Sequence, residues 1–93
     1  MIQSFKDKET ERIFNRLRSR KFSSPLARMA LKKLLILDAA ESIQDLRSPP
    51  GNRLEQLSGS RKGQHSIRIN DQLRICFEWR QGNAIHVEII DYH

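Results

Sequence analysis

The chain has 93 residues and a net charge of +6, because its 17 Lys and Arg outnumber its 11 Asp and Glu. This length suffices for one modest core, so we expect a single domain over residues 1–93 whose basicity attracts a polyanion such as RNA, DNA, an acidic protein or anionic lipid. The single cysteine excludes internal disulfides, and no apolar run approaches the about 20 residues of a membrane span. Because the amino end is charged, we expect no signal peptide. These features predict a cytoplasmic protein that does not enter a membrane.

Two helices are predicted in the first half of the chain. A short strand over Ile2–Phe5 precedes Asp7, whose side chain suits the N-cap of a helix that runs to about Arg18. Ser24-Pro25 supplies an N-cap and a proline at the first helical position of a second helix, which reaches about Ala40. The first helix has a narrow apolar stripe and the second a very wide one, so we expect the second to be sandwiched between other elements.

The second half of the chain has the pattern of β structure. A short helix over Glu41–Arg47 ends at a Pro-Pro-Gly segment, and a weak strand over Arg53–Leu57 and a polar glycine loop follow. Two alternating runs, His65–Ile69 and Leu73–Trp79, are separated by a turn that suits a tight hairpin. A last alternating strand over Ile85–His93 ends the chain.

The alternation sorts the strand side chains into two faces. The apolar members are expected to be buried, and they are Ile67, Ile69, Leu73, Ile75, Phe77, Trp79, Ile85, Val87 and Ile89. Arg68 and Arg74 belong to the opposite face, which is expected to be concave, basic and exposed if the helices cover the first face. The glycine loop over 59–63 and the carboxyl terminus are expected at the rim of that surface.

Such a surface suits the cleavage of RNA without a metal. The reaction needs a base for the 2′-hydroxyl proton, an acid for the leaving 5′-oxygen and cations for the phosphate between them. The candidates for moving or orienting protons are Glu55, Asp91, Tyr92 and His93. The cationic candidates for binding RNA phosphates are Arg61, Lys62, Arg68 and Arg74. Each of these residue types also occurs as an ordinary solvated strand or loop residue.

Other chemistries find less support in the sequence. The 3 histidines lack the spacing of metal ligands, and there is no clustered set of carboxylates, so no metal site is expected. A phosphate-binding loop, a nucleophile elbow and a dinucleotide fingerprint are all missing, so no cofactor is expected. Cys76 stands between apolar residues of a strand and is expected to be part of the core.

The same residues resemble a known family. The chain resembles HigB toxins of the RelE/ParE superfamily, which belong to type II toxin-antitoxin systems, in Asn52–Glu55, in the run LSGSRKGQHSIRINDQLRICF over residues 57–77 and in the terminal Asp91-Tyr92-His93. The resemblance extends to Ile2–Lys6 and Leu37–Ala40 and so covers nearly the whole chain. It implies an α+β fold in which two amino-terminal helices pack on one face of a small, mainly antiparallel sheet.

The resemblance also implies an activity, a partner and a site. It implies an endoribonuclease that cuts mRNA in the ribosomal A site, contacts ribosomal RNA and is neutralised by a HigA-type antitoxin with a helix-turn-helix. By motif match, Arg74 is the phosphate-binding arginine and Asp91-Tyr92-His93 is the carboxyl-terminal catalytic group. Some family members have a histidine where this chain has Glu55, and a lysine where it has Ser58, so the identity of the general base stays open.

Two other functions remain open at this point. One is that of a ParE-like toxin of the same superfamily, which blocks DNA gyrase without cutting RNA and has no need of the terminal Asp91-Tyr92-His93. The other is that of a basic protein that binds ribosomal RNA without cleaving it. The combination of Arg74 with the terminal tripeptide favours the endoribonuclease.

Overall fold

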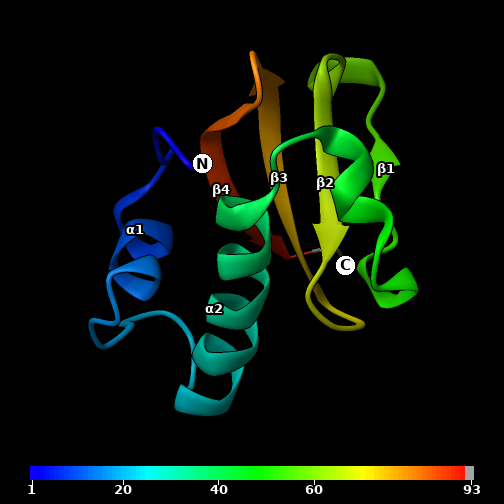
Figure 1. Cartoon of the computed structure of the whole chain (residues 1–93). Helices are drawn as coiled ribbons and strands as arrows, with labels where there is room; N and C mark the ends of the chain where they lie inside the picture. The colour runs from blue at the N-terminus through cyan, green and yellow to red at the C-terminus, as the bar shows by residue number, and fades with distance from the viewer. Residues whose placement is uncertain (92–93) are drawn as a thin grey trace.

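The computed structural model describes residues 1–91, in which a helical layer covers one face of an antiparallel sheet (Figure 1). The elements in chain order are α1 (Lys8–Phe14), α2 (Ser24–Ala39), the 3-10 turns η1 (Ile43–Arg47) and η2 (Pro50–Asn52), β1 (Glu55–Gln56), the 3-10 turn η3 (Gly59–Arg61), β2 (Gln64–Arg68), β3 (Leu73–Arg80) and β4 (Asn83–Asp91). The predicted α+β architecture is confirmed. Among the described residues, no helix is long and apolar enough to cross a membrane.

Helix α1 begins as predicted and ends earlier. The Asp7 carboxylate accepts a hydrogen bond from the Thr10 backbone N–H at 3.3 Å, which makes it the N-cap. The helix stops at Phe14 because Arg16 adopts a left-handed φ of 62°. The N–H groups of Arg16 and Leu17 then bond back to the last turn, at 3.0 and 2.9 Å, in the pattern of a Schellman motif. The sequence has no glycine to mark this end, so the prediction that the helix reaches about Arg18 is wrong.

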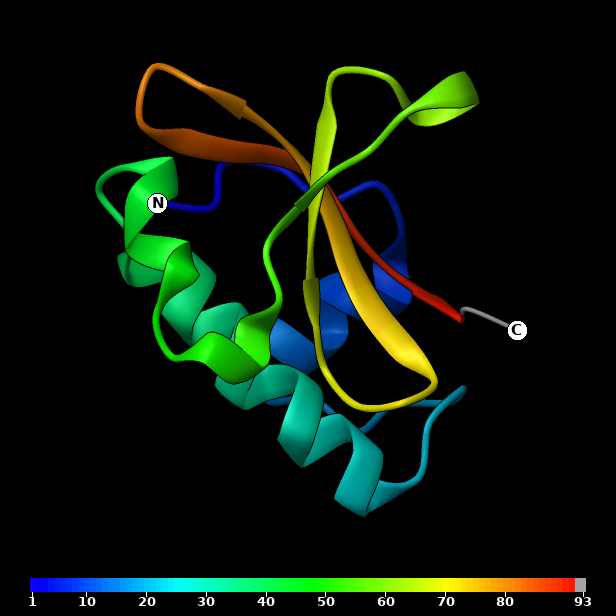
Figure 2. The same cartoon turned by 90° about the vertical axis from the view of Figure 1, so that its right-hand side faces the viewer.

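The inner face of helix α2 packs against the sheet. Its N-cap is Ser23, whose hydroxyl accepts from the Leu26 N–H at 3.4 Å, so the predicted cap at Ser24 is one residue too late. Contacts with α1 and with β4 bury Ala30, Leu34 and Leu37. The prediction that α2 is sandwiched holds only in part: its inner face is covered, but Met29 and Leu35 of the apolar arc are exposed, and Figure 2 shows the helix from the side.

The sheet has the order β1-β2-β3-β4 with every pair antiparallel. The predicted hairpin of β2 and β3 is confirmed. The strand predicted over Ile2–Phe5 is reduced to two isolated parallel bridges, from Ile2 to Ala84 and from Phe5 to Val87. The weak strand predicted over residues 53–57 shrinks to β1, since Arg53 takes a left-handed φ of 44° and cannot continue a strand.

A β-bulge shifts the alternation of β4. His86 has a φ of 54°, and His86 and Val87 together oppose the single residue Phe77 of β3. As a result Ala84 is buried and Ile85 is only half-buried, which corrects the prediction for Ile85. The shared core between helices and sheet otherwise contains the predicted strand residues, except that Trp79 is half-buried.

Candidate active site

The sheet face opposite the helices carries the predicted polar residues. Cross-strand pairing aligns Glu55 with Ser66, Ser66 with Cys76 and Cys76 with Glu88, so one row of side chains crosses all four strands. The next row pairs Arg68 with Arg74, and Arg74 with Ile90. The fold therefore brings residues that lie up to 33 positions apart in the sequence, from 55 to 88, onto one surface.

Arg74 lies at the centre of this surface and is only 7% exposed. Its Nε donates to Ser66 Oγ at 2.9 Å, and its Nη2 donates to the Arg53 carbonyl at 2.6 Å and to the Ser66 carbonyl at 3.4 Å. The prediction that Arg74 is exposed is wrong, because the segment after η2 folds against it and supplies an acceptor. These hydrogen bonds hold the planar guanidinium in one orientation on the predicted face.

Glu55 provides a carboxylate next to this arginine. Its Oε2 lies 3.7 Å from Arg74 Nη2, and its side chain is 55% exposed. Such a group is accessible from solvent and near enough to Arg74 for both to contact one phosphodiester. The prediction that Glu55 and Arg74 lie on one surface is consistent with this geometry.

Arg61 reaches the same surface from η3. Its Nη1 donates to Gln64 Oε1 at 3.1 Å and to Glu88 Oε2 at 3.0 Å. The same Glu88 oxygen lies 3.3 Å from Lys6 Nζ, so one carboxylate, 16% exposed, holds two cations. The sequence prediction missed Lys6 and Glu88 as parts of this surface, because only the register of β4 and its bridges to the amino-terminal segment place them there.

The other predicted RNA-binding residues lie in β2 and in the loop that precedes it. Arg68 is half-buried beside Arg74 in the strand pairing, and its guanidinium forms an ion pair with Asp71 in the hairpin turn. Two arginines directly opposite each other repel, and the carboxylates of Glu55 and Asp71 offset that repulsion. Lys62 is exposed in the loop directly after η3.

The carboxyl end of β4 lies next to this group. Asp91 pairs with Leu73, and its Oδ2 accepts from Gln72 Nε2 at 3.0 Å. Ile90, one residue earlier, is the strand partner of Arg74. The structure thus places Asp91 beside the hairpin that carries Arg74. Tyr92 and His93 lie outside the described residues.

Three further titratable groups belong to the sheet, and Cys76 lies in the site row between Ser66 and Glu88. Burial raises the pKa of the Cys76 thiol, so this side chain stays neutral; it is buried as predicted, but on the site face of the sheet. A hydrogen bond of 2.5 Å from the His86 ring lowers the pKa of Glu78. Burial lowers the pKa of His65, which stacks on Phe77 at 6.1 Å between ring centroids and whose Nδ1 has no partner within residues 1–91.

The described side chains supply cations, a carboxylate and hydrogen-bond donors on one surface. In the described part of the chain, no three His, Cys, Asp or Glu side chains gather as the ligands of a metal ion do. The arrangement is chemically suited to bind a phosphodiester and to move one proton near Arg74.

Comparison with known proteins gives the family. Residues 3–93 match the family described as the RelE-like toxin of type II toxin-antitoxin system HigB. Toxin HigB-1 of Vibrio cholerae is 45% identical over 87 residues, which are 92% of this chain and 92% of that protein. An uncharacterized protein of Haemophilus influenzae is 37% identical over 73 residues, or 78% of this chain and 71% of that one.

A solved structure has the same fold at low sequence identity. A chain of the YoeB-YefM complex from Staphylococcus aureus superposes with a TM-score of 0.59 at 13% identity, over 100% of this chain and 98% of that one. This likeness concerns the fold alone. The family match and the identity to the Vibrio toxin show more: the chain belongs to the HigB family of RelE-like toxins of type II toxin-antitoxin systems.

Proposed function

We propose that the chain is a ribosome-dependent endoribonuclease that cuts mRNA in the A site without a metal of its own, and that a HigA-type antitoxin neutralises it. Membership of the RelE-like toxins supports this proposal. The observation that carries it is Arg74, a guanidinium only 7% exposed and fixed by hydrogen bonds beside a carboxylate. A rigid cation next to a proton acceptor is what phosphodiester cleavage requires.

In the proposed reaction the 2′-hydroxyl of the RNA attacks the adjacent phosphorus. A base removes the 2′-hydroxyl proton, the new oxygen–phosphorus bond forms, and the bond to the 5′-oxygen breaks as that oxygen takes a proton from an acid. The products are a 2′,3′-cyclic phosphate and a 5′-hydroxyl. Glu55 is our candidate for the base, and Tyr92 and His93, with Asp91 to orient them, are candidates for the proton-transfer groups at the carboxyl terminus.

Arg74 is proposed to stabilise the charge that builds on the phosphate. A donor already fixed by Ser66 and by the Arg53 carbonyl needs no rearrangement when the charge develops. Its burial also lowers the local dielectric constant, which strengthens its attraction for an anion. Arg61, Lys62 and Arg68 are proposed to bind neighbouring phosphates of mRNA or ribosomal RNA.

The experiment is cleavage of a defined mRNA placed in ribosomes, with the purified chain added. Primer extension locates the cut, and the chemistry of the new 3′ end identifies a cyclic phosphate or its hydrolysis product. Arg74→Lys is the test variant, and Arg80→Ala is the matched control, since Arg80 is an exposed arginine at the far end of the same strand. Intact transcripts together with inhibited gyrase, or ribosome binding without any cut, would contradict the proposal.

A further inference from the structure

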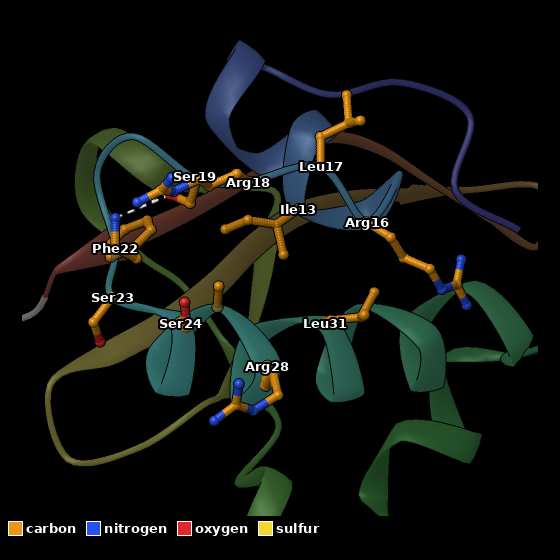
Figure 3. Close-up of a pocket in the computed structure, with 11 residues that line it drawn as sticks. Ile13, Arg16, Leu17, Arg18, Ser19, Phe22, Ser23, Ser24, Arg28 and Leu31 are labelled. Atoms are coloured by element: carbon orange, nitrogen blue, oxygen red, sulfur yellow. Dashed lines mark hydrogen bonds between the residues drawn. The ribbon is translucent and has the colours of Figure 1, made fainter.

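A groove of about 510 Å³ lies in the helical layer, away from the residues of the candidate active site (Figure 3). One wall is the end of α1 with the segment that follows it, and the other is the first half of α2. Its lining residues are Ile13, Arg16, Leu17, Arg18, Ser19 and Phe22 on the first side, and Ser23, Ser24, Ala27, Arg28 and Leu31 on the second.

The inner surface of the groove is apolar. Ile13, Phe22 and Leu31 line it from both walls, and Leu17 stands at its edge with 51% of its surface exposed. A half-exposed leucine is common on proteins, but one at the edge of an apolar groove gains when a partner covers it. Covering Leu17 would remove apolar surface from water without moving the backbone.

The charged residues that line the groove are all cationic. Arg16, Arg18 and Arg28 line it, and no Asp or Glu is among the lining residues. In Figure 3 the Arg16 and Arg28 side chains come from opposite walls. An occupant is therefore expected to carry carboxylates on either side of an apolar stripe, because opposite charges select partner and orientation.

Hydrogen bonds to α1 hold the first wall, the segment after that helix, in place. Glu9 Oε1 accepts from Ser19 Oγ at 3.2 Å and from the Arg20 N–H at 2.8 Å, and the latter bond lowers the pKa of Glu9. Arg12 Nη2 donates to the Arg18 carbonyl at 2.9 Å. A preformed groove loses little conformational entropy when a partner binds.

We propose that this groove docks an acidic amphipathic segment of the cognate antitoxin. The inference rests on the antitoxin partner in the proposed function, and it assigns that partner a surface separate from the sheet face. An aliphatic inner surface with one phenyl ring favours a peptide with leucine-like side chains over RNA, which needs aromatic platforms for its bases. The antitoxin can then hold the toxin through side chains that take no part in cleavage.

The test uses the complex with the protein encoded by the adjoining reading frame, purified after coexpression. Hydrogen exchange of the free chain and of the complex is compared, and protection of residues 13–31 is expected. Leu17→Glu places a carboxylate where the acidic segment should bind and is expected to weaken the affinity more than 10-fold. The matched control is Leu35→Glu, since Leu35 is a 39% exposed leucine of α2 outside the groove, and its affinity should not change.

Both variants should keep wild-type melting temperatures and wild-type cleavage of ribosome-bound mRNA, since neither position belongs to the candidate active site. Unchanged affinity of Leu17→Glu, with protection confined to the sheet face, overturns the proposal. Loss of ribosome binding with unchanged antitoxin affinity also overturns it and identifies the groove as an RNA surface. If the unaltered chain does not bind the neighbouring protein at all, this inference and the proposed partner fail together, while the cleavage assay still tests the proposed reaction.

Discussion

Replacing Arg74 should affect both stability and activity, and the structure gives the size of each effect. Arg74→Ala removes the donors to Ser66 Oγ at 2.9 Å and to the Arg53 carbonyl at 2.6 Å. A hydrogen bond from a charged group contributes about 1.5–3 kcal/mol, and relief of the cost of burying the guanidinium offsets part of the loss. We expect the free energy of unfolding to fall by about 2–4 kcal/mol, which lowers the melting temperature by roughly 10–30 °C for a chain of this size.

Arg74→Lys separates the two effects because it keeps the charge and loses the planar fork of donors. Cleavage should be measured as a single turnover of mRNA in programmed ribosomes, at a temperature where circular dichroism shows the variant to be folded. We expect the rate to fall by about 10²-fold or more, the effect of removing one preorganised donor to the transition state. Arg80→Ala, measured under the same conditions, should cleave at the wild-type rate.

Two results would refute this reasoning. A folded Arg74→Lys or Arg74→Ala variant with the wild-type rate would remove the arginine from the reaction. A melting temperature of Arg74→Ala equal to that of the unaltered chain would show that the buried hydrogen bonds contribute nothing to stability.

Three further predictions concern Glu88, the last two residues of the chain and His65. Glu88→Gln should raise KM by up to about 5-fold with little change in kcat. The reason is that a partly exposed ion pair, here the one that positions Arg61, contributes at most about 1 kcal/mol. A fall of kcat by the same factor instead would place Glu88 in the chemical step. Deleting Tyr92-His93 should nearly abolish cleavage while changing the free energy of unfolding by no more than about 1–2 kcal/mol, and a truncated chain that still cuts at full rate would leave Glu55 and the arginines as the only candidates. Burial lowers the pKa of His65, so its stabilising contribution is present above the usual value of 6.5 and is lost as the pH falls below it. Thermal melts of wild type should therefore weaken more steeply below that pH than melts of His65→Phe, and parallel curves for the two proteins would argue against this.

The sequence predicted the elements whose signals are local. The Asp7 cap and the alternation of β2 and β3 depend on neighbouring residues, and both are confirmed. The end of α1 at Phe14 and the bulge at His86 were not predicted. Each depends on a positive φ at a residue that is not glycine, Arg16 in the first case and His86 in the second. Such conformations are imposed by tertiary contacts and leave no mark in the pattern of hydrophobicity.

The burial and the partners of the candidate site residues could not be predicted from the sequence for a similar reason. Alternation placed Arg74 on the face opposite the helices, and that part is correct. Its burial depends on the Arg53 carbonyl, which is contributed by a segment 21 residues away. The ion pairs of Glu88 with Lys6 and Arg61 likewise join three separate segments of the chain. Contacts between distant segments depend on the assembled fold. The local sequence pattern therefore predicts which residue lies on which face, but it does not predict that residue's hydrogen-bond and ion-pair partners.

The amino-terminal segment has a consequence for how the protein can be handled. Its backbone runs beside β4 and exchanges hydrogen bonds with Ala84 and Val87 at 2.8–3.1 Å, so it occupies the outer side of that strand. An open strand edge is a template on which a second chain can pair. Residues 1–6 therefore cover this edge of β4 and oppose self-association. Removing them should make the protein aggregate at high concentration. An affinity tag is consequently awkward at the amino end, because the segment there covers the edge of the sheet.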